Sequence, residues 1–273
     1  MRRPFLDHWR DDLRAIATAL DTHGSRDRGD ARPIPPPELI RRVNSAEKAD
    51  AAVFLRSGVS DLQAIVETLA DAVESRTRDR EPPFPAHPTI MELGCGLGRL
   101  LRHAPDPALA HVIATDVNAG SLDWCRAHLL NVDYHLHGPL PPIASLPAAS
   151  IDVVYAHSVF THVPLEHQTV WLRELARLLR PAGWLAITCL GHVQQEALLN
   201  EEEQAILRTT GAIQIRPEYM PGHDDPVMYG AVCQTVADQE ATVGAVFDIV
   251  RRRERHARQD VVVARRRVRE SHG

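Results

Sequence analysis

The spacing of apolar residues changes along the chain. In the first third, apolar side chains recur three and four positions apart, which places them on one face of a helix. This spacing predicts helices over 5–20, 38–56 and 60–75. Ser60 is a suitable N-cap for the third of these helices. Charged and then proline-rich residues follow, so we expect residues 1–85 to form an N-terminal helical extension or cap.

From residue 89 onward, short apolar runs alternate with stretches of helical spacing. The predicted strands are 89–93, 111–115, 132–136, 151–156 and 184–189. The predicted helices are 97–104, 119–130, 165–180 and 194–209. Strands that alternate with helices are typical of a parallel sheet with right-handed crossovers.

The last part of the chain completes this prediction. Two apolar runs, 245–250 and 261–264, read as an antiparallel pair that closes the sheet, whereas 210–233 is expected to be irregular. We therefore expect residues 86–273 to form one α/β domain. Its sheet would be doubly wound, mostly parallel and seven-stranded, with an antiparallel C-terminal strand.

Charge and cysteine content exclude some classes of protein. The 273 residues carry 31 basic and 36 acidic side chains, a net charge of −5, so no overall basic field attracts nucleic acid. The four cysteines show no C-x-x-C spacing and are expected to be free thiols in a reducing compartment. No apolar run reaches membrane-spanning length, and the N-terminus lacks the apolar core of a signal peptide. A cytoplasmic protein is expected.

The most informative stretch is Thr-Ile-Met-Glu-Leu-Gly-Cys-Gly-Leu-Gly-Arg over 89–99. A strand leads into a glycine-rich turn, in which Gly94 or Gly96 can adopt a positive φ without steric cost. Asp116 ends the next predicted strand, and open α/β sheets bind ligands at the carboxyl ends of their strands. A carboxylate there can accept hydrogen bonds from two ribose hydroxyls. Methyltransferases and dinucleotide-dependent enzymes both use this arrangement, so these residues alone do not separate the two.

Two later segments favour a methyltransferase over a dinucleotide-dependent enzyme. Residues 146–164 read Leu-Pro-Ala-Ala-Ser-Ile-Asp-Val-Val-Tyr-Ala-His-Ser-Val-Phe-Thr-His-Val-Pro, and 171–188 read Trp-Leu-Arg-Glu-Leu-Ala-Arg-Leu-Leu-Arg-Pro-Ala-Gly-Trp-Leu-Ala-Ile-Thr. Together with the glycine-rich turn, they resemble the class I, Rossmann-like S-adenosylmethionine-dependent methyltransferases of the bacterial small-molecule type. The resemblance is strong over about 89–190. It implies a methyltransferase that uses S-adenosyl-L-methionine.

The resemblance also implies which residues contact the cofactor. They follow the first four strands of the sheet: Glu92, Gly94, Cys95, Gly96, Arg99, Asp116, Val117, Leu136, His137, Ala156, His157 and Ser158. Asp116 would hold the ribose, and Val117 would pack on the adenine. Many relatives carry an aspartate after the third strand, where this chain has His137 and Gly138. Arg99 either pairs with the cofactor carboxylate or is an ordinary arginine at a helix start.

The sequence lacks several motifs, and their absence excludes some classes of methyl acceptor. The chain lacks an Asn-Pro-Pro-aromatic motif after the fourth strand, a Pro-Cys nucleophile and the paired glutamates of arginine methyltransferases. It also lacks the acids that hold a metal in catechol-type enzymes. We therefore expect metal-independent transfer to an oxygen or nitrogen of a small molecule, and the resemblance favours a natural product or a sugar-bearing metabolite.

Two histidines are candidates for the general base. His157 and His162 follow the fourth strand, and neutral imidazole titrates in the range that a base needs. Each of them is otherwise a packed or hydrogen-bonded histidine. His192 and His223 are weaker candidates, and His223 is better explained as part of a polar turn.

The acceptor pocket is expected to come from the N-terminal helices and from a substrate lid over 191–230. Apolar and aromatic residues of these segments are Phe54, Tyr219, Met220, Met228 and Tyr229. Ordinary packing explains most of them equally well. The basic runs 251–253 and 265–267 read as solvated strand ends, because no aromatic residues are interleaved with them.

Three other functions stay open. The same fold can methylate RNA or protein, a bound sulfonium can serve a reaction other than methylation, and an NAD-dependent oxidoreductase shares the glycine-rich turn. The expected partner is a small-molecule acceptor, with no membrane partner. Nucleic acid is disfavoured, and a homodimer is left open.

Overall fold

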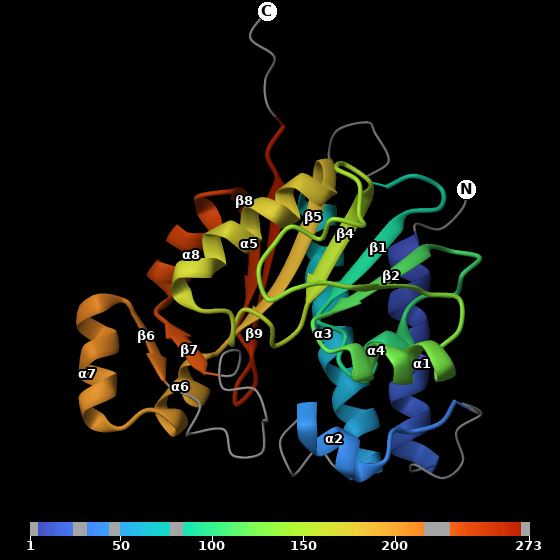
Figure 1. Ribbon diagram of the computed structural model, residues 1–273, viewed down its shortest axis with the longest axis horizontal. Helices are drawn as coiled ribbons and strands as arrows, with labels where there is room; N and C mark the ends of the chain where they lie inside the picture. Colours follow the sequence, from blue (N-terminus) through green and yellow to red (C-terminus); the bar gives the residue numbers. More distant parts are fainter. Residues whose placement is uncertain (1–4, 24–31, 44–49, 77–83, 216–229, 269–273) are drawn as a thin grey trace, which may run out of the picture. The chain divides into compact units, whose positions relative to one another are not determined.

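The computed structural model describes residues 5–23, 32–43, 50–76, 84–215 and 230–268. Seven strands form one sheet in the order β3-β2-β1-β4-β5-β9-β8, and two more form a small separate sheet (Figure 1). Strands β1 to β5 pair in parallel where they pair with one another, and β9 is antiparallel to β5 and to β8. The predicted doubly wound, mostly parallel seven-stranded α/β fold is confirmed. The chain divides into two compact units, residues up to His137 and residues from Gly138 onward.

The first unit combines the N-terminal helices with three parallel strands. Its helices are α1 (Phe5–His23), α2 (Pro37–Val43), α3 (Ala51–Arg76) and α4 (Ala119–His128). Its strands are β1 (Thr89–Leu93), β2 (His111–Asp116) and β3 (Asp133–Leu136). Helices α1 and α3 lie side by side (Figure 1). The three predicted strands and the helix near 119–130 are confirmed to within a few residues.

Three helix predictions in this unit are wrong. The helix expected over 38–56 is not continuous, because Asp50 is a bend whose carboxylate accepts from the N–H groups of Ala52 and Val53 at the start of α3. Helix α3 is continuous, so Ser60 lies inside it and is not an N-cap; burial of Ser57, Gly58 and Val59 holds the chain helical through the expected break. Residues 97–104 do not form an α-helix but turns and a short 3-10 helix, η3 (Leu101–His103). Gly98 has φ +73°, which a right-handed helix does not accommodate.

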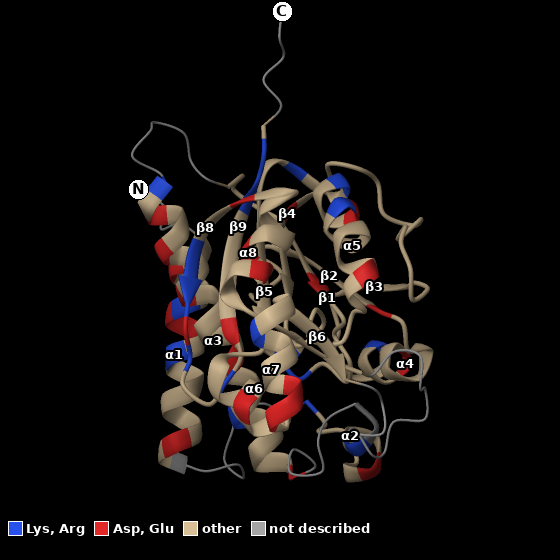
Figure 2. Ribbon diagram, turned by 90° about the vertical axis from the view of Figure 1, so that its left-hand side faces the viewer, with Lys and Arg blue, Asp and Glu red and all other residues tan. Residues whose placement is uncertain are grey.

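The second unit contains the rest of the large sheet. Its strands are β4 (Ile151–Ala156), β5 (Leu179–Cys189), β8 (Phe247–Arg253) and β9 (Asp260–Arg266). Its longer helices are α5 (Leu165–Leu178) and α8 (Val236–Gly244). The predicted antiparallel pair is confirmed as β8 and β9. The basic run 251–253, blue in Figure 2, ends β8, and the run 265–267 begins with the last two residues of β9. Arg267 pairs with Asp248 at 2.9 Å.

The segment after β5 differs from the prediction. The helix expected over 194–209 is two helices, α6 (His192–Leu198) and α7 (Glu201–Thr210), because Asn200 and Glu203 form a capping box that starts a new helix. Within 210–233, expected to be irregular, β6 (Ala212–Ile215) pairs with β7 (Ala231–Gln234).

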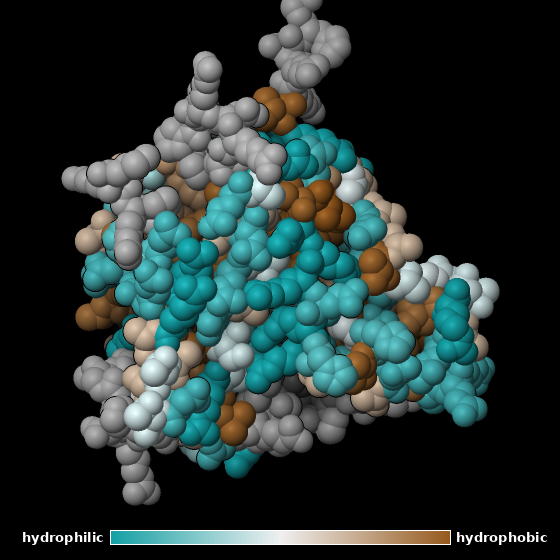
Figure 3. Space-filling model, turned by 180° about the vertical axis from the view of Figure 1, so that it is seen from behind, coloured by the Kyte–Doolittle hydropathy of each residue, from teal (hydrophilic) through white to brown (hydrophobic). Residues whose placement is uncertain are grey.

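None of the helices within the described ranges combines the length and apolar character needed to cross a membrane. Figure 3 shows one face of the molecule, on which hydrophilic side chains predominate and hydrophobic ones form small separate groups.

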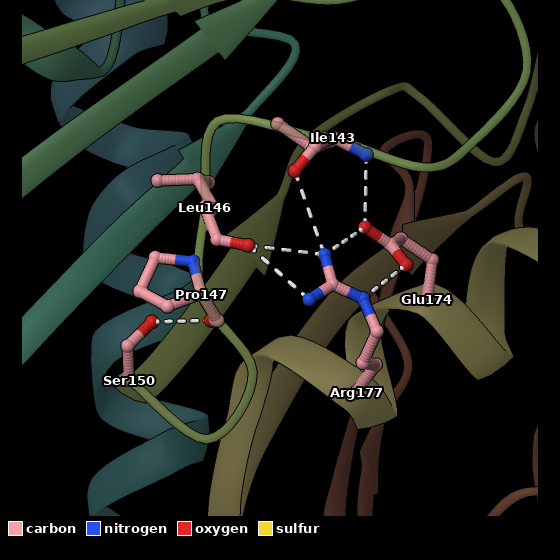
Figure 4. A network of polar contacts seen from close by, with 6 residues as sticks. All are labelled: Ile143, Leu146, Pro147, Ser150, Glu174 and Arg177. Carbon is pink, nitrogen blue, oxygen red and sulfur yellow. Dashed lines mark hydrogen bonds and ion pairs between the residues drawn. The ribbon is translucent and has the colours of Figure 1, made fainter.

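Buried polar contacts fasten the loop that precedes β4 to helix α5 (Figure 4). The Glu174 carboxylate accepts from the backbone N–H of Ile143 at 2.9 Å and from Arg177 at 2.6 and 2.8 Å. The same guanidinium donates to the carbonyl oxygen of Leu146 at 3.2 Å. Because Glu174 is only 6% exposed, water cannot replace these partners. The contacts fix the entry to the strand that carries His157 and Ser158 at its end.

Replacing Glu174 with glutamine is expected to lower the free energy of unfolding by about 1–2 kcal/mol, because a charge-assisted pair becomes a neutral one. Urea-induced unfolding measures the change. Glu166→Gln, in the same helix with a side chain that is 74% exposed, is the matched control and should change stability by less than about 0.5 kcal/mol. Equal effects of the two changes would mean that the Glu174 contacts do not stabilise the unit.

Candidate cofactor site

The glycine-rich turn after β1 is held against the end of β2. The backbone N–H groups of Gly94 and Cys95 both donate to the carbonyl oxygen of Thr115, at 2.8 and 3.0 Å. Gly94 has φ +70° and Gly96 φ +51°, as predicted. Other residues rarely adopt these angles, so the glycines are required by the backbone of the turn itself.

Asp116 closes the turn from the other side. Its Oδ2 accepts from the Gly96 N–H at 2.7 Å, and its Oδ1 accepts from the Asn118 N–H at 2.8 Å. The carboxylate is 7% exposed, and burial raises its pKa although the backbone donors work in the opposite direction. Each carboxylate oxygen has a second lone pair, so Asp116 can still accept hydrogen bonds from a ligand.

Gly96 faces open space, whereas Gly98 is packed. Among the residues that the structure describes, a Cβ added at Gly96 would meet no atom within 4 Å. A Cβ added at Gly98 would lie 2.4 Å from Cδ1 of Leu129 and 3.2 Å from Sγ of Cys125. The turn therefore presents bare backbone on the side of Gly96, next to the Asp116 carboxylate. A ligand can approach the main chain there, which is the feature that a nucleoside-binding turn needs.

The other predicted cofactor residues of this unit lie near the turn or next to Asp116. Glu92 is buried at the end of β1, and Val117 is half-buried directly after Asp116. The His137 N–H donates to the carbonyl oxygen of Asp116 at 3.2 Å, and its side chain lowers the pKa of the Asp116 carboxyl. Leu136 is 55% exposed at the end of β3, so its side chain is available to a ligand.

Cys95 belongs to the turn but is not a nucleophile. Its thiol and that of Cys125 both donate to the carbonyl oxygen of Gly96, at 3.7 and 3.3 Å. The neighbouring Cys125 thiol and then burial raise the pKa of the Cys95 thiol well above its ordinary value. A protonated, buried thiol shapes the turn and does not attack a substrate.

Arg99 points its guanidinium to α3. Its Nη1 donates to Oδ2 of Asp61 at 2.8 Å and to Oγ of Ser57 at 3.2 Å. Both charged residues are buried, with 6% of Arg99 and 4% of Asp61 exposed. Arg99 was predicted either to pair with the cofactor carboxylate or to be an ordinary arginine at a helix start. Because its guanidinium already pairs with Asp61, a cofactor carboxylate would have to compete with this ion pair. Sequence reasoning missed Asp61 because it lies 38 residues before Arg99, in a helix with no motif around it.

In the second unit, polar contacts fix the end of β4. Ser158 has φ +60°, a strained angle for a residue other than glycine, and strained residues gather at functional sites. Its N–H donates to Oγ1 of Thr188 at 2.8 Å, and its Oγ accepts from Nε2 of Gln259 at 2.8 Å. The Thr188 hydroxyl donates to Oε1 of Gln259, which closes a ring of hydrogen bonds. Ala156 and His157 precede Ser158 at the strand end, and His157 is half-buried.

The histidine candidates have different surroundings. Nδ1 of His162 lies 2.9 Å from the carbonyl oxygen of Gly230, the contact of a structural histidine. His192 is 82% exposed and lies 3.4 Å from Glu196. His223 and the residues Tyr219, Met220, Met228 and Tyr229 lie outside the described residues. Within the described ranges, no three His, Cys, Asp or Glu side chains come together to hold a metal ion.

Three features define the class I, Rossmann-like methyltransferase fold: the strand order, the glycine-rich turn, and the acids Glu92 and Asp116 at the ends of β1 and β2. Comparison with known proteins agrees with this. Residues 91–187 match a family model that is described as a methyltransferase domain.

Two solved structures share the fold. A SAM-dependent methyltransferase from Methanosarcina mazei is 17% identical with a TM-score of 0.50, and the match covers 70% of this chain and 99% of that one. A second, from Mesorhizobium loti, is 16% identical with a TM-score of 0.50, covering 67% of this chain and 94% of that one. At this identity the likeness establishes the fold alone. The open backbone at Gly96 and the acceptor capacity of Asp116 fit the bound nucleoside of S-adenosylmethionine.

Proposed function

We propose that this protein transfers a methyl group from S-adenosylmethionine to an oxygen or nitrogen of a small molecule, without a metal ion. The observation that carries the proposal is the pairing of Asp116 with the Gly96 N–H at 2.7 Å, beside backbone that no side chain of the described residues covers. This pairing places a hydrogen-bond acceptor for ribose hydroxyls next to a surface that a nucleoside can approach.

Residues at the ends of β1, β2 and β3 would each contact a different part of the cofactor. Asp116 would hold the ribose, Glu92, Gly94, Cys95 and Gly96 would line the methionine part, and Val117, Leu136 and His137 would contact the adenine. The bound sulfonium supplies an activated methyl group, so orienting the acceptor provides much of the rate. Ala156, His157 and Ser158 would flank the cofactor. His157 is our first candidate for a base and His162 the second, and a base is needed only if the acceptor is protonated.

A cavity supports a small acceptor. The described part of the proposed lid, 191–230, contributes α6 and α7 to a cavity of about 670 Å³ in the second unit, a volume in the range of small-molecule sites. Leu190, Val193, Leu199 and Leu207 line it together with the charged side chains of Arg252 and Asp260. An acceptor with an apolar body and polar groups suits this lining. A natural product or a sugar-bearing metabolite is the class we propose, in the cytoplasm.

The acceptor class can be tested directly with methyl-labelled S-adenosylmethionine. The protein is incubated with separate pools of small metabolites, RNA and protein, and the label transferred to each pool is counted. The proposal predicts label in the small-metabolite pool that depends on the protein and is lower in Asp116→Ala. Label confined to RNA or to protein would overturn the small-molecule assignment while keeping the methyltransferase.

The raised pKa of Asp116 predicts a pH dependence of cofactor binding. Protonation removes acceptor capacity from the carboxyl group, so affinity for S-adenosylhomocysteine should fall as the pH drops through this pKa. The fall should begin above the pH of about 4 at which an ordinary aspartate protonates, because burial raises the pKa. Titrations at several pH values measure it, and Asp116→Asn should remove this component. An unchanged profile in that variant would assign the titration to another group.

A further inference from the structure

The segment that follows the glycine-rich turn is fastened to three separate N-terminal elements. Nε1 of Trp9 in α1 donates to the carbonyl oxygen of His103 at 2.9 Å. Nη2 of Arg102 donates to the carbonyl oxygen of Arg32 at 3.0 Å. Arg99 pairs with Asp61 of α3 at 2.8 Å. Residues 99–103 are thus attached to parts of the chain that lie 38 to 94 positions away.

Helix α3 approaches the backbone of this segment very closely. A Cβ added at Gly58 would lie 2.2 Å from the carbonyl oxygen of Arg99, too close for any side chain. The hydroxyl of Ser57, one residue earlier, accepts from the Arg99 guanidinium at 3.2 Å. One turn of α3 therefore meets both the main chain and the side chain of Arg99, and Asp61 continues the same contact.

Apolar packing joins the turn itself to the same helices. Leu97, between Gly96 and Gly98, is 4% exposed and belongs to a buried cluster with Ile40 of α2 and with Phe54 and Leu55 of α3. The turn is therefore held by N-terminal helices on an apolar side and, through Arg99, on a polar side.

This attachment has a physical reason. In place of an α-helix, the turn is followed by a 3-10 helix of three residues, η3. Such a short helix has little stability of its own, because it forms too few hydrogen bonds to offset the conformational entropy lost when a helix is nucleated. Its neighbours must set its conformation. A buried ion pair such as that of Arg99 and Asp61 adds little net stability, because both charges lose their water. It does fix geometry, because moving the two residues apart would leave two unpaired charges in the interior.

We propose that Asp61 is a positioning residue of the cofactor site, and that the helices within 5–76 are part of that site and not a separable cap. Asp61 holds Arg99, and Arg99 holds the turn in the geometry in which Gly96 presents its backbone beside Asp116. The cofactor role of the turn rests on the proposed function; the positioning itself does not.

The test compares Asp61→Asn with Glu74→Gln, a change at a 65% exposed side chain of the same helix. Amide hydrogen exchange over 94–103 is measured without ligand, and affinity for S-adenosylhomocysteine is measured by calorimetry. We expect Asp61→Asn to speed exchange over 94–103 and to weaken binding by about 3- to 30-fold. Glu74→Gln should change neither. Unchanged exchange and unchanged affinity in Asp61→Asn would overturn the proposal.

Two further variants separate positioning from a general loss of stability. Phe247→Leu shrinks a fully buried side chain of β8 in the second unit and lies outside the proposed site, so it should lower the melting temperature and leave the affinity unchanged. If Asp61→Asn does not fold, Ser57→Ala removes the weaker partner of Arg99 and should give a smaller change in the same direction. Failure of the wild-type protein to bind S-adenosylhomocysteine would contradict the proposed function, while the exchange comparison would still decide the role of Asp61.

Discussion

Replacing Asp116 with alanine is expected to weaken binding of S-adenosylhomocysteine by roughly 1.5–3 kcal/mol, the range for loss of hydrogen bonds to a charged group. That corresponds to an affinity about 10- to 150-fold lower. The change removes the acceptor for the ribose hydroxyls. It also leaves the Gly96 and Asn118 N–H groups without the carboxylate that they contact at 2.7 and 2.8 Å. Calorimetric titration measures the loss.

A second aspartate provides the control. Asp133, at the start of β3, has a 63% exposed side chain that lies 2.8 Å from His111, away from the glycine-rich turn. Asp133→Ala should leave the affinity unchanged. An unaltered affinity in a folded Asp116→Ala variant would contradict the assignment of Asp116 as a cofactor-binding residue.

The glycines of the turn should respond differently to alanine. Gly98→Ala is expected to lower the free energy of unfolding by about 2–4 kcal/mol, because it combines a left-handed backbone at φ +73° with a Cβ that would lie 2.4 Å from Leu129. Gly96→Ala keeps the backbone cost of about 1–2 kcal/mol but meets no neighbouring atom. Its methyl group would occupy the space that we assign to the ligand, so it should reduce binding more than stability.

Chemical unfolding and titration of both variants test this contrast. The expected pattern is a stability loss dominated by Gly98→Ala, and a Gly96→Ala protein that stays folded but binds S-adenosylhomocysteine at least about tenfold more weakly. Normal affinity in Gly96→Ala would mean that the open space beside Gly96 is not the ligand site.

Local patterns in the sequence predicted the strands of the seven-stranded sheet, the glycine-rich turn and the position of Asp116 at the end of β2. These features depend on residues close together in the chain: an apolar run, glycines at positive φ, and an acid at a strand end. Even the relation between Gly96 and Asp116 follows from the rule that strand ends in a parallel sheet meet at one edge.

Contacts between distant residues were beyond the reach of those patterns. Asp61 binds Arg99, and Gln259 binds Ser158 across 101 positions, yet no local pattern around Asp61 or Gln259 indicates these contacts. The helix expected over 97–104 failed because Gly98 interrupts it, and the break expected near Ser60 failed because burial overrode the local capping signal. In the second case tertiary packing decided the outcome.

Titration of the purified protein with S-adenosylhomocysteine, with NAD as the comparison ligand, tests the central claim most directly. The arrangement of Asp116 and Gly96 predicts saturable binding of S-adenosylhomocysteine and much weaker binding of NAD. Preferential binding of NAD, or no binding of S-adenosylhomocysteine by a folded sample, would contradict the methyltransferase function.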